Sequence, residues 1–122
     1  MTMRGYKSGI TTVEDTPFGY TLSLISGKWK MAILYLLAEN QPVRYNQLQR
    51  YIRSITYKSL SLQLKQLEAD GLVVRKEFPQ VPPRVEYSLS EKGESIIPIF
   101  EMMCEWGMAH EDVASQKQDV AS

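Results

Sequence analysis

The chain has little of what secreted, membrane-spanning or disulfide-stabilised proteins need. Its 122 residues contain a single cysteine, Cys104, which excludes an intramolecular disulfide and is typical of the reducing cytosol. No apolar run approaches the roughly 20 residues of a membrane-spanning helix. The first residues also lack the apolar segment of a signal peptide. These absences predict a cytoplasmic protein that has no membrane partner.

The residue groups of common active sites are missing as well. The chain has one histidine and one cysteine, and neither lies in a recognisable nucleophile or metal-ligand arrangement. The seven glycines are scattered and form no phosphate-binding loop. Carboxylates gather near the C-terminus, where a solvated helix face explains them. We therefore predict a protein that is not an enzyme and has no catalytic residue, metal ion or cofactor.

The net charge is zero, but the charges are unevenly distributed along the chain. Between residues 44 and 84, eight Lys and Arg residues stand against three acids, a net charge of +5. From residue 85 onward two Lys residues stand against eight acids, a net charge of −6. A phosphate backbone responds to the local field within a Debye length of about 10 Å. The central segment is therefore the candidate nucleic-acid surface.

The stretch from Thr56 to Leu72 is typical of one amphipathic helix with a start signal and a stop signal. Thr56 can cap the first turn, because its hydroxyl accepts a hydrogen bond from a backbone N–H. Leucines at helical spacing predict a buried seam, and Gly71 suits the left-handed residue that ends a helix. The opposite face is short, basic and hydroxylated. Taken alone, this face is more typical of a solvated surface than of one that reads DNA, because most surface helices have such a face.

Three helices are predicted before this one. The first covers 17–25, the second, which is nearly all apolar, covers 28–39, and the third covers 45–52 after a weakly signalled strand at 43–44. Ser26 is expected to cap the second helix, whose strongest face carries Trp29, Ile33, Leu36 and Leu37. The third helix and the stretch at 56–72 are joined by a short break, which is typical of a helix-turn-helix.

After Gly71 the apolar period changes from 3.6 to 2, which predicts strands. Two alternating runs at 72–78 and 84–89 flank a Pro-rich tip, so we expect a two-stranded hairpin. A helix-turn-helix followed by a hairpin is a winged helix. Ser90 is expected to cap a last helix, in which Pro98 predicts a kink or a restart. The predicted fold class is therefore α+β, mostly helical.

Three strings carry a resemblance to a known family. They are S-G-K-W-K-M-A-I-L-Y-L-L at 26–37, Q-L-E-A-D-G-L-V-V-R at 66–75 and V-P-P-R-V-E-Y-S-L-S-E-K-G at 81–93. In this order and spacing they resemble the HxlR family of bacterial winged-helix transcription regulators, relatives of the MarR type, over residues 17–107. The resemblance implies a homodimer that binds operator DNA, with additional N- and C-terminal dimerisation helices.

Candidate DNA-binding residues lie on the helix that begins after Thr56 and on the hairpin. We expect Lys58, Ser61 and Lys65 in the major groove, because hydroxyl and ammonium groups reach base edges and phosphates. Leu62 on the same face either touches a thymine methyl or is merely tolerated there, and Arg84 is expected in the minor groove, on a phosphate or in solvent. Further contacts to the backbone or at the leading end are expected from Tyr57, Ser59, Lys76 and Arg44.

The last predicted helix carries an apolar stripe with several open uses. It fits internal core, a dimer interface or the border of a ligand pocket. Given the resemblance, we favour a dimer interface, for which the candidate residues are Phe18, Leu22, Ile99, Met102, Met103 and Trp106.

One departure from the family pattern concerns the signal. Many members carry a Cys-Pro pair just before the first helix, and in some of them that thiol senses oxidants or electrophiles. Here Thr16 precedes Pro17, and a threonine hydroxyl forms neither a thiolate nor a disulfide. Cys104 lies in the last predicted helix and is no evident substitute. Any stress or redox response is thus expected to operate without the usual sensing thiol.

We therefore predict a transcription regulator that binds a palindromic double-stranded DNA operator as a homodimer. Residues 1–15 are expected to form an arm, 16–112 the winged-helix DNA-binding domain and 113–122 a flexible tail. Two alternatives stay open. One is a winged-helix module for protein–protein contact, and the other is a regulator controlled by a small-molecule effector at the dimer-interface helices.

Overall fold

The computed structural model describes residues 12–111, so most of the predicted arm and the whole predicted tail lie outside the described residues. Within this range the chain forms the mostly helical α+β arrangement of a winged helix-turn-helix. The elements in order are the 3-10 turn η1 (Val13–Asp15), α1 (Pro17–Ile25), α2 (Lys30–Asn40), β1 (Val43–Arg44), α3 (Tyr45–Tyr51), α4 (Tyr57–Ala69), β2 (Val73–Phe78), β3 (Arg84–Leu89), α5 (Glu91–Glu94) and α6 (Ile97–His110).

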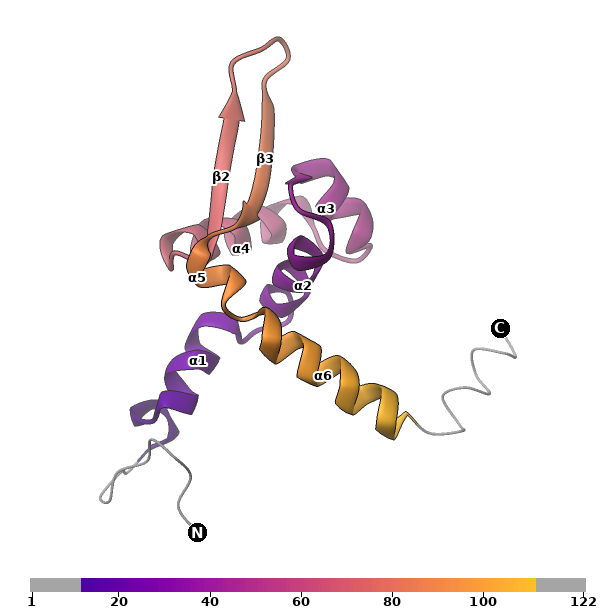
Figure 1. Ribbon diagram of the computed structural model, residues 1–122. Helices are drawn as coiled ribbons and strands as arrows, with labels where there is room; N and C mark the ends of the chain where they lie inside the picture. The colour runs from indigo at the N-terminus through magenta and orange to yellow at the C-terminus, as the bar shows by residue number, and fades with distance from the viewer. Residues whose placement is uncertain (1–11, 112–122) are drawn as a thin grey trace.

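The sheet is antiparallel and has the strand order β1-β3-β2. The predicted hairpin is confirmed, with Val73 opposite Leu89 and Phe78 opposite Arg84. The weakly signalled strand at 43–44 is also present and pairs with β3, placing Val43 opposite Tyr87. Figure 1 shows the β2–β3 wing projecting from the helical body on one side, while α1 and α6 extend from the other.

The core forms where α2, α3 and α4 meet the inner face of the sheet. Leu60, Leu64 and Leu67 of α4 are buried, as their spacing predicted. They join Leu48 of α3 and the buried face of α2 in one cluster of apolar side chains. Each such side chain stabilises the fold by about 1.5–3 kcal/mol relative to leaving it exposed. This burial fixes which face of α4 is left for a ligand.

The expected start of the second helix was wrong by two residues, since α2 begins at Lys30. Ser26 does not cap it; instead the Ser26 N–H donates to Leu22 O and ends α1. The left-handed Gly27, with φ of 104°, then turns the chain before α2 can begin. On α2 itself Ile33, Leu34 and Leu37 are fully buried, whereas the expected core residues Trp29 and Leu36 are only partly buried.

The C-terminal part of the chain is interrupted as Pro98 predicted. Ser90 Oγ accepts a hydrogen bond from Gly93 N at 3.0 Å and caps α5. The helix stops after one turn, and α6 begins at Ile97 with Pro98 in its first turn, where the missing N–H costs nothing. Ile96 and Phe100 are buried and attach α6 to the core. The rest of α6 therefore extends beyond the body, as Figure 1 shows.

Candidate nucleic-acid interface

The α4 helix is delimited by its own sequence at both ends. Thr56 Oγ1 accepts a hydrogen bond from Ser59 N at 3.0 Å, as the N-cap prediction required. At the other end Gly71 has φ of 79°, which L side chains rarely adopt. There Gly71 N donates to Glu68 O and Leu72 N to Leu67 O, both at 3.0 Å, the paired bonds of a Schellman motif. The length of the exposed basic face is thus set by local chemistry.

The exposed face of α4 carries the side chains that were expected to reach DNA. Lys58, Leu62 and Lys65 all point away from the leucine seam and are exposed, Leu62 by 50%. Tyr57 at the leading end is 66% exposed, and Ser59 is partly buried. The two lysines can donate to phosphate or base oxygens without rearranging the helix.

Tyr45 of α3 ties down the leading end of α4, a role that the sequence did not reveal. Its hydroxyl donates to Tyr57 O at 2.8 Å, and its ring centroid lies 4.9 Å from that of Tyr57. The same hydroxyl contacts Ser61 Oγ at 2.9 Å. Because Tyr45 has one proton and gives it to the carbonyl, Ser61 is the donor in this second bond. Burial raises the pKa of Tyr45, which keeps the hydroxyl neutral in this role.

This contact changes what Ser61 offers to DNA. Its hydroxyl proton is committed to Tyr45, and its side chain is partly buried. Ser61 therefore presents acceptor lone pairs rather than a free donor, while Lys58 and Lys65 remain fully available. Sequence reasoning placed all three on one face without distinguishing them.

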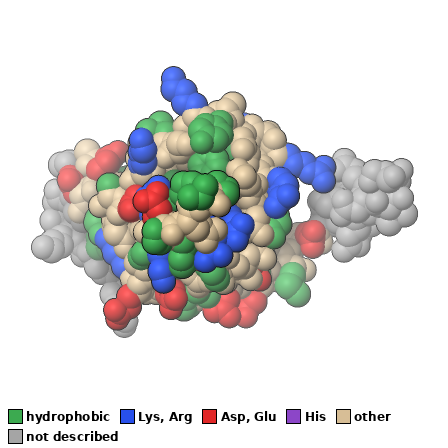
Figure 2. Space-filling view, turned by 90° about the horizontal axis from the view of Figure 1, so that it is seen from above, with side chains coloured by type: hydrophobic (Ala, Val, Ile, Leu, Met, Phe, Trp, Pro, Cys, Tyr) green, Lys and Arg blue, Asp and Glu red, His purple; other side chains and the backbone are tan. Residues whose placement is uncertain are grey.

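A groove of about 770 Å³ separates α4 from the wing. Cationic side chains from four different elements border it, together with Glu68 and three tyrosines. Of these cations, Arg75 also pairs with Glu77 at 3.5 Å, and a hydrogen bond with Tyr87 raises its pKa. The four cations are Arg44, Lys65, Arg75 and Arg84. Figure 2 looks onto this end of the molecule and shows Lys and Arg side chains around the hydrophobic wing tip.

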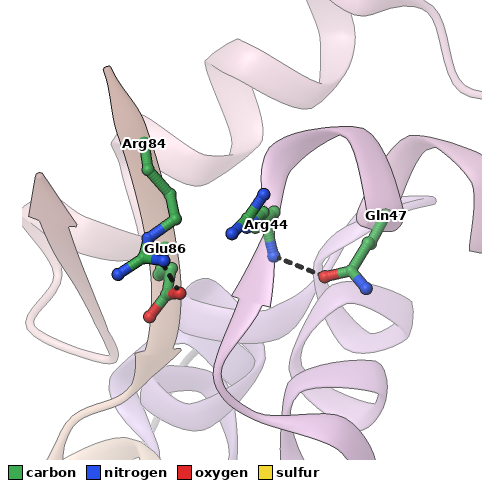
Figure 3. Close-up of polar contacts among 4 residues, drawn as sticks. All are labelled: Arg44, Gln47, Arg84 and Glu86. Carbon is green, nitrogen blue, oxygen red and sulfur yellow. Dashed lines mark hydrogen bonds and ion pairs between the residues drawn. The ribbon is translucent and has the colours of Figure 1, made fainter. Parts of the chain in front are cut away.

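On the wing, Arg84 lies against its own hairpin. Its guanidinium carbon is 4.0 Å from the centroid of the Phe78 ring, and Nε is 3.4 Å from Glu86 Oε2. Lys76 reaches the same ring, with Nζ 5.0 Å from the centroid. Arg44, at the end of β1, is exposed, and its backbone N–H donates to Gln47 Oε1 at 2.9 Å (Figure 3). Three of the expected cations thus lie on the strands of one short sheet.

The residues expected at a dimer interface are exposed at the opposite end of the chain's fold. Their exposed fractions run from 39% for Leu22 to 68% for Met102. Intrachain core, one of the open uses of the stripe on the last helix, is therefore wrong for Ile99, Met102, Met103 and Trp106. Phe18 of α1 is 55% exposed. Trp106 also stacks on His110 with ring centroids 4.2 Å apart.

Thr16 is the one buried polar side chain among the described residues, with 3% of its surface exposed. It is the N-cap of α1: Oγ1 accepts from Gly19 N at 2.9 Å and donates to Val13 O at 2.6 Å. A threonine directly before Pro17 is itself a cap signal in the sequence, because threonine suits the N-cap and proline the first helical position. Position 16 thus has a structural role in this chain.

Other chemistry is sparse in the described part of the chain. Cys104 is exposed on α6. Between residues 12 and 111, no three His, Cys, Asp or Glu side chains gather as they would around a metal ion. In the same range, no helix combines the length and the apolar character that crossing a membrane takes.

Comparisons with known proteins agree on one group. The family model of the HxlR-like helix-turn-helix matches residues 24–115. The HTH-type transcriptional regulator BH0655 of Halalkalibacterium halodurans is 62% identical over 112 residues, which cover 92% of this chain and 99% of BH0655. YdzF of Bacillus subtilis, also named an HTH-type transcriptional regulator, is 53% identical over 96 residues, covering 79% of this chain and 88% of YdzF. The solved structure of the redox regulator HypR in its reduced form is 44% identical, with a TM-score of 0.75 over 83% of this chain and 99% of that one.

Proposed function

Since this chain belongs to the HxlR-like helix-turn-helix family of DNA-binding transcription regulators, we propose that it acts as a homodimer on a two-fold symmetric operator. Its family and its named relatives are regulators rather than enzymes. One observation carries the proposal. The exposed cations of α4 and the wing lie at one end of the fold, and the exposed apolar side chains of α1 and α6 lie at the other.

At the DNA end, α4 enters the major groove with Lys58 and Lys65 foremost. Tyr57, Ser59, Ser61 and Leu62 complete the contact face at the leading end and the middle of the helix. Lys76, Arg84 and Arg44 act from the sheet on phosphates or on the minor groove. Phosphate contacts supply most of the affinity, so binding weakens steeply with salt.

At the other end, the exposed faces of α1 and α6 pair with those of a second copy. Large apolar side chains that are half exposed in one chain are costly in water, and Met and Trp are enriched at interfaces. Two-fold pairing through these helices gives two α4 helices related by the same axis. Their half-sites on DNA then lie about one helical turn, or a multiple of it, apart.

The signal that controls the regulator does not act through a thiol at residue 16. HypR is named a redox regulator, but in this chain Thr16 has no sulfur to oxidise. Alkylating the exposed Cys104 with iodoacetamide should leave the affinity for operator DNA unchanged. A loss of binding after alkylation would show that Cys104 is not inert toward DNA binding.

DNA binding is tested by selecting fragments of the source organism's genomic DNA on the purified protein, followed by footprinting. We expect an enriched two-fold symmetric sequence. Lys65→Ala and Arg84→Ala should each weaken binding and flatten the slope of log K against log[salt] by up to about one unit. Lys92→Gln is the control, because Lys92 contacts Tyr20 and the backbone of Asp70, the residue that ends α4. Failure to enrich any sequence would favour a module for protein–protein contact.

The dimer is tested by sedimentation of Trp106→Ala, which removes the second most exposed of the six candidate side chains. The dissociation constant of the dimer should rise at least tenfold, since central aromatic side chains contribute about 2 kcal/mol or more at interfaces. Tyr51→Ala removes an aromatic side chain of similar exposure, 51%, from α3 and serves as the control. An unchanged dissociation constant for Trp106→Ala would place the interface elsewhere.

A further inference from the structure

One face of the sheet carries one acid among three basic side chains, two of which, Arg44 and Arg84, also border the groove toward α4. Alternate residues of a strand point to the same face, so Arg84 and Glu86 of β3 share a face. The strand register places Arg44 of β1 on one side of Glu86 and Lys76 of β2 on the other. Directly opposed residues have Cβ atoms about 5 Å apart. The Glu86 carboxylate is therefore surrounded by cations that were each assigned to DNA.

Among these cations, Arg84 is the one in contact with Glu86. Nε of Arg84 is 3.4 Å from Glu86 Oε2, with the side chains 30% and 20% exposed. Phe78, directly opposite Arg84 across the hairpin, supports the guanidinium with its ring. Figure 3 shows the Arg84 side chain extending along β3 to Glu86, with the Arg44 side chain directed toward the same strand. Without DNA, Arg84 is thus held on the protein.

This arrangement leaves a donor of Arg84 unsatisfied. Its Nε is buried from water and makes no hydrogen bond, although it lies near the Glu86 carboxylate. Charge and ring stacking hold the guanidinium here, and a buried N–H without an acceptor is unfavourable. A phosphate or a base edge in a narrow minor groove offers such an acceptor together with a strong negative potential. The held position is therefore one from which suitable DNA can draw Arg84 away.

We propose that Glu86 is a specificity-determining residue, whose carboxylate competes with DNA for Arg84 so that only DNA with a narrow, strongly negative minor groove recruits this arginine. The proposal rests on the proposed function, which assigns Arg84 to DNA. On DNA with a wide minor groove Arg84 stays with Glu86 and adds nothing to affinity. Removing the charge of Glu86 frees Arg84 for any DNA. Affinity should therefore rise most on DNA with a wide minor groove, which Glu86 otherwise keeps from Arg84.

The test compares two labelled duplexes of equal length by fluorescence anisotropy over a range of salt concentrations. One duplex contains A-tracts, whose minor groove is narrow, and the other contains alternating G and C. The proteins are the full chain, Glu86→Gln and the control Glu77→Gln. The control substitution removes the same charge from the same hairpin. Glu77 pairs with Arg75 rather than Arg84, and 57% of its side chain is exposed.

We expect the full chain to prefer the A-tract duplex. Glu86→Gln should bind the G/C duplex about twofold to fivefold more tightly, the range for a partly exposed ion pair, and gain less on the A-tract duplex. On the G/C duplex its salt slope should steepen by up to about one unit, because one more phosphate is contacted. Glu77→Gln should shift both duplexes equally. In an Arg84→Ala background Glu86→Gln should lose its effect on selectivity.

Two results would overturn the proposal while leaving DNA binding intact. The first is equal affinity of the full chain for both duplexes. The second is a change in selectivity for Glu86→Gln that equals the change for Glu77→Gln, or that persists when Arg84 is replaced by alanine. Absence of binding to either duplex at low salt would instead refute the proposed function itself. If Glu86→Gln does not fold, Glu86→Asp keeps the charge but withdraws it from Nε. Its selectivity should fall in the same direction, and unchanged selectivity would count against Glu86.

Discussion

Replacing Thr16 by valine should destabilise the fold by about 1–3 kcal/mol, because it removes a buried hydroxyl without changing the shape of the side chain. That hydroxyl accepts from Gly19 N at 2.9 Å and donates to Val13 O at 2.6 Å. Valine leaves the buried Gly19 N–H without an acceptor in the first turn of α1. Thr16→Ser keeps both hydrogen bonds and loses one buried methyl group, which costs about 0.8 kcal/mol.

The assay is urea unfolding followed by far-UV circular dichroism, at several protein concentrations because dimerisation adds to the apparent stability. Hydrogen exchange of the Gly19 amide reports the cap directly. A loss of about 1.4 kcal/mol in local opening free energy speeds exchange tenfold in Thr16→Val, whereas Thr16→Ser should exchange at nearly the rate of the parent chain. If the valine variant is as stable as the serine variant and protects Gly19 equally well, the cap carries no energy and the reasoning is refuted.

Further substitutions probe the helix-turn-helix. Leu64→Ala should cost about 2–4 kcal/mol in urea unfolding because Leu64 is 2% exposed, while Leu62→Ala, at 50% exposed, should change stability by less than about 0.5 kcal/mol and act on DNA affinity instead. Gly71→Ala should cost about 1 kcal/mol, since φ of 79° strains any residue with a Cβ. Tyr45→Phe frees Tyr57 and Ser61, and anisotropy should show weaker DNA binding with a stability loss of only about 1 kcal/mol.

The parts of the fold that follow from local chemistry were predictable from the sequence. Both ends of α4 were predictable, because the Thr56 cap and the left-handed Gly71 each depend only on residues within one helical turn. The hairpin and the restart at Pro98 follow for the same reason. The start of α2 was not predictable, because Ser26 could either end α1 or cap α2. It ends α1, and the left-handed turn at Gly27 delays the start of α2.

The site was predictable as a set of residues but not as an arrangement. The charge imbalance and the helical wheel indicated the exposed lysines of α4. The contact of Arg84 with Phe78 and Glu86 depends on strand register across a Pro-rich tip, which alternation alone does not define. The role of Tyr45 depends on how closely α3 approaches α4. An apolar stripe such as that of α6 has the same sequence pattern in a core and in an interface. Only the structure therefore shows that its side chains are exposed.

The hydrogen bonds of Thr16 explain how the first helix begins without a thiol at residue 16. The first turn of α1 directs the Gly19 N–H at the side chain of residue 16. Unpaired N–H groups and the positive end of the helix dipole stabilise an anion at such a position, so a cysteine there would form its thiolate readily. Threonine uses the same donor with a neutral hydroxyl and passes its own proton to Val13 O. Residue 16 of this chain therefore caps α1 and offers no thiol for an oxidant to modify.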